Sequence, residues 1–411
     1  MSSSLIHFPR LIDCHVHFRE PGLEHKGTMA TEAAAARAGG VGTVCEMPNT
    51  IPPTVTVAAL ADKVRRAHAI KDCDIRFFFG VTEKTHLIAL RNIWIKSDFE
   101  LQRLKKKCCG VKLYLDHSTG NQKAESDVVE EAFKLCGELG IPVVAHCEDS
   151  MINEVERGRW KEESDDISLY SKMRSPESEA KSIAFAIGLA RKYKTKFHVA
   201  HLSTALGLDL VRDAKKEGLS VTCEVAPHHL FLTTDDYKTL GTLGKMNPPL
   251  RSKEDQAVLW QGIADGTVDC IATDHAPHTL EEKGVVVGAT HASPLQHQSN
   301  IDFQKIPSGV PGVETMLPLL LMVAAGNWPH PSSKRPSTAK LSYEDIVKLC
   351  FTNPNRIFSL GCSDARVFTI DPKKEWTIHA SDLHSKCGWT PYEDWHVRGK
   401  IIGGWPADRS T

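Results

Sequence analysis

Eight short apolar runs constrain the fold of this 411-residue chain more than any other feature of its sequence. Most of the segments between them have the apolar periodicity and the closing glycines of helices. Near-continuous apolar strands that alternate with helices indicate parallel strands buried on both faces. Eight such units predict an α/β fold, a (β/α)8 barrel of the TIM type rather than an open sheet. The predicted strands are 11–17, 41–46, 75–80, 110–115, 142–147, 196–202, 220–225 and 268–274, and the predicted helices are 28–38, 55–69, 97–107, 125–138, 177–193, 204–217 and 252–264.

The last third of the chain has a different character. A polar, glycine-rich stretch at 281–309 predicts a long loop over one mouth of the barrel, and further helices are expected at 313–325 and 342–351, on either side of a connector at 326–340. Short strands are expected near 366–370, 375–378 and 396–402. We therefore predict a barrel over residues 1–360 and a small β-rich tail over 361–411 that packs on it.

Composition excludes several classes of partner. Lys and Arg number 50 against 51 Asp and Glu, so no charge excess points to nucleic acid or to an anionic membrane. No apolar stretch reaches the roughly 18 residues of a membrane span, and the first residues lack the pattern of a secretory signal. The twelve cysteines have no repeated metal-binding spacing and are expected as small core residues of a reduced protein. These features predict a cytoplasmic protein that acts on a small molecule.

Polar side chains that can bind metal or take part in catalysis occur where the predicted strands end. In a barrel these carboxyl ends converge on one mouth, where barrel enzymes place their catalytic groups. The first strand ends in a His-x-His pair whose imidazoles share a face, because side-chain direction repeats every two residues. The strand-end residues are His15, His17, Lys112, His146, His201 and Asp274.

These nitrogen and oxygen donors suit Zn²⁺ and, less selectively, Mn²⁺ or Co²⁺. Four imidazoles and a carboxylate are too many for one tetrahedral ion with an open position, so two ions are expected. Lys112 is the exception, because a protonated amine repels metal. It is either a lysine that extends its ammonium group to solvent from a strand end or, if carbamylated by CO2, an anionic ligand able to bridge two ions.

Eight sequence motifs together resemble those of the dihydroorotase family of the amidohydrolase superfamily, and they occur in the order typical of that family. The resemblance covers about residues 10–360. The turn at 118–121 is similar to one branch of the family, whereas EVAPHHLFL and PGVETMLPLLL are similar to the dihydroorotase part of the animal multifunctional pyrimidine polypeptide. The motifs are HVHFREPG at 15–22, MPNT at 47–50, KLYL at 112–115, AHCED at 145–149, AHLS at 200–203, EVAPHHL at 224–230, NPPLR at 247–251 and TDHAPHTLEEK at 273–283.

The resemblance implies a two-zinc enzyme that interconverts N-carbamoyl-L-aspartate and L-dihydroorotate in pyrimidine (UMP) biosynthesis. Asp274 would be both a metal ligand and the catalytic proton carrier. The implied ligands are His15, His17 and Asp274 for one zinc and His146 and His201 for the other, with carboxylated Lys112 and a hydroxide as bridges.

The resemblance also implies the substrate contacts. Arg19 and Asn49 would hold the α-carboxylate, helped by Asn247 and His278. Arg19 lies two residues beyond His17, hence on the same face, and its planar fork suits a carboxylate. A flexible loop would close over the ligand. Its residues are Ser118, Thr119, Gly120 and Asn121.

One departure from the animal sequences concerns an additional zinc, which there is associated with a cysteine directly before the strand-6 histidine and with the strand-7 glutamate. This chain has Ala200 at that position, so no third ion is expected and Glu224 is expected to hydrogen-bond a ligand histidine. No ligand role is assigned to His198, His228 or His229.

Two other functions are compatible with the motifs. A dihydropyrimidinase, hydantoinase or allantoinase shares the metal scaffold but opens rings without a carboxylate, so Arg19 argues against it. An inactive scaffold domain of a pyrimidine multienzyme is the second alternative, against which the complete ligand set argues. The resemblance further implies a homodimer and an association with other enzymes of the pathway.

Overall fold

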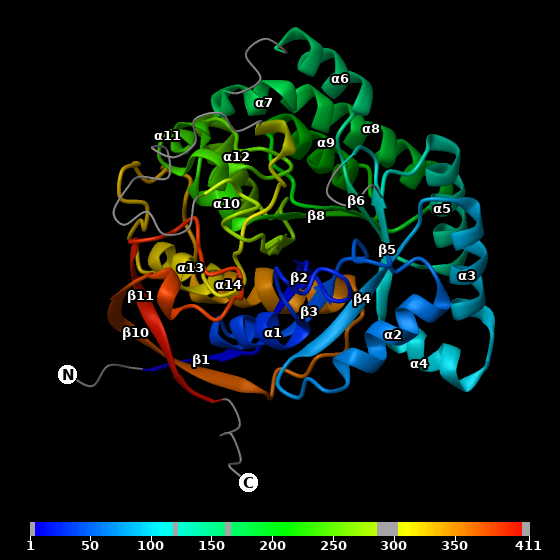
Figure 1. Cartoon of the computed structure of the whole chain (residues 1–411), viewed down its shortest axis with the longest axis horizontal. Helices are drawn as coiled ribbons and strands as arrows, with labels where there is room; N and C mark the ends of the chain where they lie inside the picture. Colours follow the sequence, from blue (N-terminus) through cyan, green and yellow to red (C-terminus); the bar gives the residue numbers. More distant parts are fainter. Residues whose placement is uncertain (1–4, 118–121, 161–165, 286–302, 405–411) are drawn as a thin grey trace.

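The computed structural model describes residues 5–117, 122–160, 166–285 and 303–404. Its described strands form two sheets, one of eight strands and one of three. The eight-stranded sheet lies inside a layer of helices, and the smaller sheet lies at one side of the molecule (Figure 1). The predicted (β/α)8 architecture is confirmed.

The eight strands of the large sheet pair in sequence order, and every neighbouring pair is parallel. The sheet closes where the segment after the last strand meets the first: Val16 forms a bridge with His275, and the His17 amide donates to the His275 carbonyl at 2.7 Å. The strands are β2 (Leu11–Val16), β3 (Val41–Glu46), β4 (Asp74–Gly80), β5 (Cys108–Tyr114), β6 (Val143–His146), β7 (Phe197–Val199), β8 (Val221–Val225) and β9 (Cys270–Ile271).

The helices that cover the barrel follow the predicted pattern, with additions. The seven helices expected between the strands are present with small shifts of their ends. The predicted helices correspond to α1 (Met29–Ala38), α2 (Val57–Ala67), α4 (Phe99–Lys107), α5 (Ser126–Leu139), α8 (Pro176–Tyr193), α9 (Ala205–Lys216) and α12 (Lys253–Ala264), followed by α13 (Met316–Ala324) and α14 (Tyr343–Val347). Six described α-helices had no counterpart in the prediction: α3 (Lys84–Ile95), α6 (Ser150–Arg159), α7 (Tyr170–Met173), α10 (Pro227–Phe231), α11 (Tyr237–Leu240) and α15 (Asn353–Ile357). Of these, α6 projects from the body of the protein (Figure 1).

Two of the predicted strands are longer than the observed ones. The run 196–202 gives only β7, and 268–274 gives only β9. In both cases the backbone leaves the extended region before a functional side chain, because φ is +33° at His201 and +49° at Asp274. Arg19, beyond the end of β2, also has a positive φ of +71°. Non-glycine residues rarely adopt this region, and where they do, the strain often accompanies a functional site.

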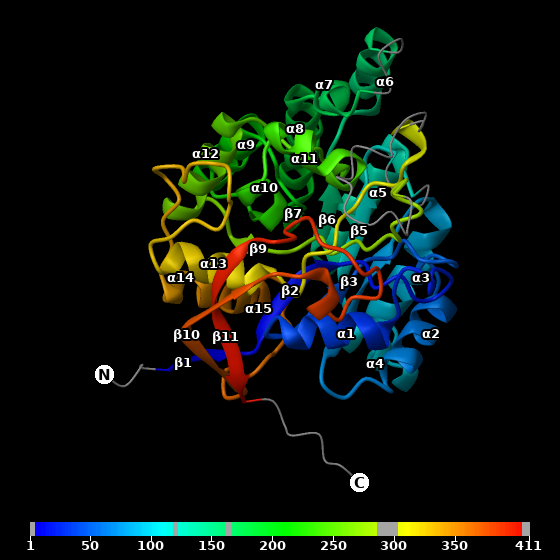
Figure 2. The same ribbon diagram turned by 60° about the vertical axis from the view of Figure 1, so that its left-hand side comes forward.

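The small sheet combines the two ends of the described chain. β1 (Ile6–Pro9) pairs antiparallel with β10 (Val367–Thr377), which pairs antiparallel with β11 (His396–Gly403). β11 packs against α13 at the side of the barrel (Figure 2). The sheet therefore includes an N-terminal strand in addition to the predicted tail, and the division into domains at residue 360 stays a prediction.

No helix in the described part of the chain is long and apolar enough to cross a membrane. All twelve cysteines are free thiols, and ten of them are buried. This agrees with their expected role as small core residues.

Candidate metal centre and substrate site

The predicted site residues converge at the carboxyl ends of the barrel strands. Nine of the ten that lie in the described residues line one cavity, and the tenth, His278, contacts Arg19 at its edge. The predicted loop Ser118–Asn121 lies outside the described residues. The cavity is lined by His15, His17, Arg19, Asn49, Lys112, His146, His201, Asn247 and Asp274, together with Tyr114, Ala276, Ser308 and Gly309.

One corner of the cavity joins β2 to the segment after β9. The Nε2 atoms of His15 and His17 lie 3.3 and 3.1 Å from the same oxygen, Oδ1 of Asp274. All three side chains are buried, and their ligand atoms lie close enough together to hold one metal ion. This group matches the first predicted ligand set.

The other corner is formed by β5, β6 and the residues after β7. Nδ1 of His146 and Nε2 of His201 are 3.1 Å apart, and the His201 ring lies 5.2 Å from the His15 ring between centroids. The Nζ atom of Lys112 is buried and has no hydrogen-bond partner among the described residues. Burial of an amine without a hydrogen-bond partner costs free energy. We therefore expect the Lys112 amine to gain a bonding partner when the site is filled.

Three acceptors fix the orientation of the histidines. Nδ1 of His17 donates to Oδ1 of Asn49 at 2.6 Å, and Nδ1 of His15 donates to the Glu224 carboxylate. Each bond places the proton on Nδ1 and leaves the lone pair of Nε2 toward the cavity, the arrangement typical of metal-binding imidazoles. The expected contact between Glu224 and a ligand histidine is thus confirmed. Glu148, which the sequence did not single out, lies 2.8 Å from Nε2 of His146.

Glu224 connects a wider buried network. Besides His15, its carboxylate accepts from Nε2 of His198 at 3.1 Å, from the thiol of Cys14 at 3.4 Å and from the His201 amide at 3.1 Å. Cys14, His198 and Glu224 could themselves hold an ion by their spacing. In this structure the Glu224 oxygens are already engaged by four donors of the chain, which suits an orienting role.

Burial and charge set the protonation states. Burial raises the pKa of the Asp274 carboxyl, but His15 and His17 outweigh it and leave the pKa well below its ordinary value. Burial lowers the pKa of His17 to about 4, against the pull of Asp274, and lowers that of His201 well below the usual range, helped by His146. Burial also lowers the pKa of Lys112 to about 8. Neutral imidazoles beside an ionised carboxylate are the forms that bind metal.

Arg19 lines the same cavity as the histidines. Its guanidinium is buried, with Nε donating to the Pro277 carbonyl at 2.9 Å and Nη2 lying 3.0 Å from Nε2 of His278. Nδ1 of the same imidazole lies 3.1 Å from Nζ of Lys26, and its Nε2 also lies 3.1 Å from the Ser308 carbonyl. Arg19 and Lys26 can only donate, so His278 lies between two cations at the edge of the cavity.

Two buried lysines that the sequence did not single out hold the wall that carries Ser308 and Gly309. Nζ of Lys283 donates to the carbonyls of Lys245, Pro307 and Gly309 at 2.9 to 3.1 Å. Nζ of Lys245 donates to the carbonyls of Phe303, Gln304 and Ile306. We call this pair the lysine clamp. Burial lowers the pKa of Lys283 well below its usual range, helped by Lys245 and Arg19, so the three cations lie close together.

Three of the other buried histidines, His198, His229 and His275, have hydrogen-bond partners. Nε2 of His229 donates to the Pro248 carbonyl at 3.1 Å, and Nδ1 of His198 contacts Thr222 at 2.8 Å. His275 contacts the buried carboxylate of Glu32 on α1 at 2.8 Å. Nε2 of His228 is buried and has no hydrogen-bond partner among the described residues.

Comparisons with known proteins show which family this chain resembles. The family model described as dihydro-orotase-like matches residues 5–206. A dihydroorotase from Halobacterium salinarum is 37% identical over 393 residues, covering 94% of this chain and 81% of that protein. The multifunctional protein CAD of Squalus acanthias is 32% identical, covering 97% of this chain and 14% of that longer protein.

Among solved structures, the L-hydantoinase (dihydropyrimidinase) of Arthrobacter aurescens is similar, with a TM-score of 0.84 and 26% identity over 97% of this chain and 83% of that one. The solved hydantoinase structure shares the barrel fold with this chain, whereas the higher sequence identity over most of the chain is to dihydroorotases. Together with the site geometry, these findings show that the chain belongs to the dihydroorotase family of cyclic amidohydrolases.

Proposed function

We propose that this protein is a dihydroorotase, which closes N-carbamoyl-L-aspartate to L-dihydroorotate with loss of water and catalyses the reverse hydrolysis. The observation that carries the proposal is the buried guanidinium of Arg19 at the edge of a histidine and aspartate cluster. The cluster suits hydrolysis of a cyclic amide, and the guanidinium suits the carboxylate that distinguishes this substrate from neutral cyclic amides.

The donor set fits two zinc ions. The inward nitrogens of four histidines, the ionised Asp274 and Nζ of Lys112, which has no hydrogen-bond partner among the described residues, surround one cavity. We propose His15, His17 and Asp274 for one ion and His146 and His201 for the other, with carboxylated Lys112 as the bridge. Bound there, the ions would polarise the ring carbonyl and lower the pKa of a water molecule, the usual help of metals in amide hydrolysis. Elemental analysis tests the expected two zinc per chain.

Asp274 is placed to move the proton. Its carboxylate is ionised at neutral pH, because His15 and His17 hold its pKa well below the ordinary value despite burial. In the hydrolytic direction it takes a proton from the attacking water and delivers it to the ring nitrogen that leaves. In the direction of ring closure the same carboxylate receives the proton of the attacking amide nitrogen.

We assign the substrate carboxylate to the wall of Arg19. The buried Arg19 guanidinium, Asn49 and Asn247 line the same cavity. Oδ1 of Asn49 accepts from Nδ1 of His17, which fixes the Asn49 amide beside the cavity. His278 contributes through its contact with Nη2 of Arg19 at 3.0 Å.

A hydantoinase or dihydropyrimidinase activity is the second candidate, supported by the structural similarity to the Arthrobacter aurescens enzyme. Replacement of Arg19 distinguishes the two. Arg19→Met removes charge-assisted hydrogen bonds of about 1.5–3 kcal/mol each, so kcat/KM for dihydroorotate is expected to fall at least roughly a hundredfold.

Zinc content and the melting temperature should stay close to those of the parent. Dihydrouracil, which lacks the carboxylate, serves as the matched control substrate, and its turnover should change little. An unaltered kcat/KM for dihydroorotate in a variant with normal zinc content would refute the assignment of the substrate.

We further propose a cytoplasmic homodimer that can associate with other enzymes of pyrimidine synthesis. Support for association comes from the similarity to part of a multifunctional protein. Sedimentation of the metal-loaded protein tests the dimer.

A further inference from the structure

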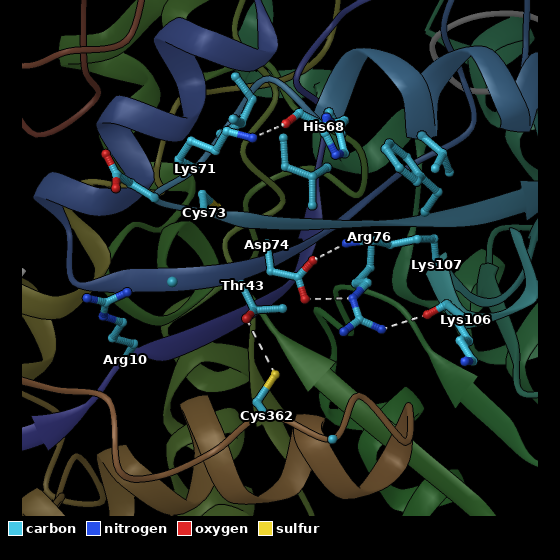
Figure 3. A pocket seen from close by; sticks show the side chains of 18 of the residues that line it. Arg10, Thr43, His68, Lys71, Cys73, Asp74, Arg76, Lys106, Lys107 and Cys362 are labelled. Carbon is cyan, nitrogen blue, oxygen red and sulfur yellow. Dashed lines mark hydrogen bonds and ion pairs between the residues drawn. The ribbon is translucent and has the colours of Figure 1, made fainter. Parts of the chain in front are cut away.

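A second hollow lies at the end of the barrel opposite the metal centre. Its volume is about 660 Å³, and it is lined where β3, β4 and β5 begin (Figure 3). Thr43 lies near the start of β3, Asp74 and Arg76 lie in β4, and Lys107 directly precedes β5. The site of the proposed reaction is formed by the other ends of these strands, so this hollow is separate from it.

Positive charge is concentrated around this hollow. Seven Lys or Arg side chains line it against two aspartates, although the whole chain carries a net charge of −1. Three of the cations, Arg103, Lys106 and Lys107, come from the basic C-terminal half of α4. The other four come from separate parts of the sequence and are brought to α4 by the fold: Arg10 precedes β2, Lys71 follows α2, Arg76 lies in β4, and Arg366 precedes β10.

Both aspartates are already engaged by the chain. Asp74 accepts from Nε of Arg76 at 2.7 Å and from Nζ of Lys107 at 2.6 Å. Asp72 accepts from Nη1 of Arg37 at 3.1 Å, and Arg37 does not line the hollow. Among the lining residues themselves, seven cations therefore stand against two aspartates, an excess of five positive charges; outside the lining, a Glu100 oxygen lies 3.7 Å from Nη1 of Arg103.

Several of these cations are held in place before any ligand arrives. Arg76 donates from Nη1 to the Lys106 carbonyl at 2.7 Å and from Nη2 to the Leu360 carbonyl at 3.3 Å. The side chain of Arg10 lies across Gly42, where a Cβ would come within 2.7 Å of it. Burial lowers the pKa of Arg10, and the neighbouring Arg366 lowers it further, whereas Asp72 opposes the shift. An anion bound in the hollow would act on Arg10 in the same direction as Asp72.

We propose that this hollow binds a small metabolite with at least two phosphate groups, of the size of a nucleoside diphosphate. A single carboxylate would offset only one of five charges, whereas a diphosphate carries about three and is the preferred partner of paired guanidiniums. The volume falls in the range of about 300–1,000 Å³ typical of small-molecule sites. Val64, Ala67 and Ile70 supply an apolar wall against which a planar base can pack.

Isothermal titration calorimetry of the zinc-loaded protein with ADP and with UDP tests the proposal. The variant is Lys71→Gln/Arg366→Gln, because both side chains are exposed and their loss leaves the packed core intact. The matched control is Lys216→Gln/Lys253→Gln, which removes the same charge from exposed positions on α9 and α12. All three proteins keep the metal centre, so heat from chelation of zinc would be common to them.

We expect saturable binding to the parent and to the control, and binding at least about tenfold weaker to the variant of the hollow, because each site loses charge-assisted hydrogen bonds. The apparent affinity should also fall as salt is added. Absence of binding to the parent overturns the proposal. So does equal binding to all three proteins, which would place the nucleotide elsewhere on the surface.

Discussion

The reactivity of Lys112 toward CO2 gives the sharpest test of the proposed bridge. Only the neutral amine attacks CO2, forming an N–C bond and releasing one proton as the carbamate appears. Burial lowers the pKa of this lysine from 10.5 to about 8, although Glu224 and Asp274 oppose the shift. The neutral form therefore increases as pH rises through about 8, rather than through the range of an ordinary lysine.

The size of the effect follows from this pKa. At pH 7.5 about a quarter of a lysine with pKa 8 is neutral, against roughly 0.1% at pKa 10.5. The structure thus predicts an amine that is about two hundredfold more available for carbamylation near neutrality. The rate should rise about ninefold between pH 6 and 7 and about fivefold between pH 7 and 8, and above about pH 8.5 it should level off.

The assay follows carbamate formation in metal-free protein. The protein is incubated with ¹³C-labelled CO2 at constant dissolved CO2 between pH 6 and 10, and the carbamate resonance is followed by NMR. Zinc is then added, and recovery of activity is measured in parallel. Recovery should track the resonance, and Lys112→Arg should give neither.

Lys63 provides a control within the same chain. It is also buried and its pKa is also lowered by burial, but its Nζ donates to the Met47 carbonyl at 3.0 Å and to Glu46 at 3.4 Å. It should stay unlabelled. A rate that continues to climb tenfold per unit up to pH 10, or label on Lys63 as much as on Lys112, would refute the reasoning.

Substitutions at three further positions test other parts of the site. Lys283→Met removes the ammonium donor from three carbonyls, and we expect KM for dihydroorotate to rise roughly tenfold with unchanged zinc content, whereas Lys283→Arg should retain much of the parent's kinetics. Glu224→Gln should weaken zinc binding about 10- to 100-fold in metal titrations, because His15 loses its charged acceptor. Burial raises the pKa of Glu148, but Arg174 and His146 outweigh it and hold the pKa well below the usual range, so its stabilising contribution is present above about pH 4.5 and is lost on acidification below it. Glu148→Gln should lower the free energy of unfolding by about 3 kcal/mol at pH 7 and flatten its fall in acid, measured by denaturant titration. An acid transition identical to that of the parent would contradict this.

The barrel could be predicted because each strand is a buried apolar run bounded by a helix. The two longest of the missed helices, α3 and α6, lack such signals. α3 has Glu83 at its N-cap without a capping hydrogen bond from the side chain, and in α6 the one buried residue is the polar Asn153, so no apolar stripe marks it. The lengths of β7 and β9 were wrong because positive φ at His201 and Asp274 depends on the assembled site, not on local propensity.

The grouping of the site residues could be predicted because all of them follow strands or lie in motifs at strand ends. The lysine clamp could not. Lys245 and Lys283 bond to backbone carbonyls tens of residues away, and a backbone carbonyl leaves no mark in the sequence. Glu148 could have been suggested from the sequence, since it lies two residues after His146, but only the fold shows that its carboxylate lies 2.8 Å from that imidazole.

The way in which the barrel closes has a consequence for the kinetics of its opening. β9 has only two residues, and its far side meets β2 through the bridge of Val16 with His275 and through the Thr273 amide, which donates to Asp13 at 3.0 Å. His15 and His17 lie on one side of this seam and Asp274 on the other. An ion shared by them would act as a staple across the shortest strand pairing, so amide hydrogen exchange at 13–17 and 272–275 should slow more on metal loading than exchange elsewhere in the sheet.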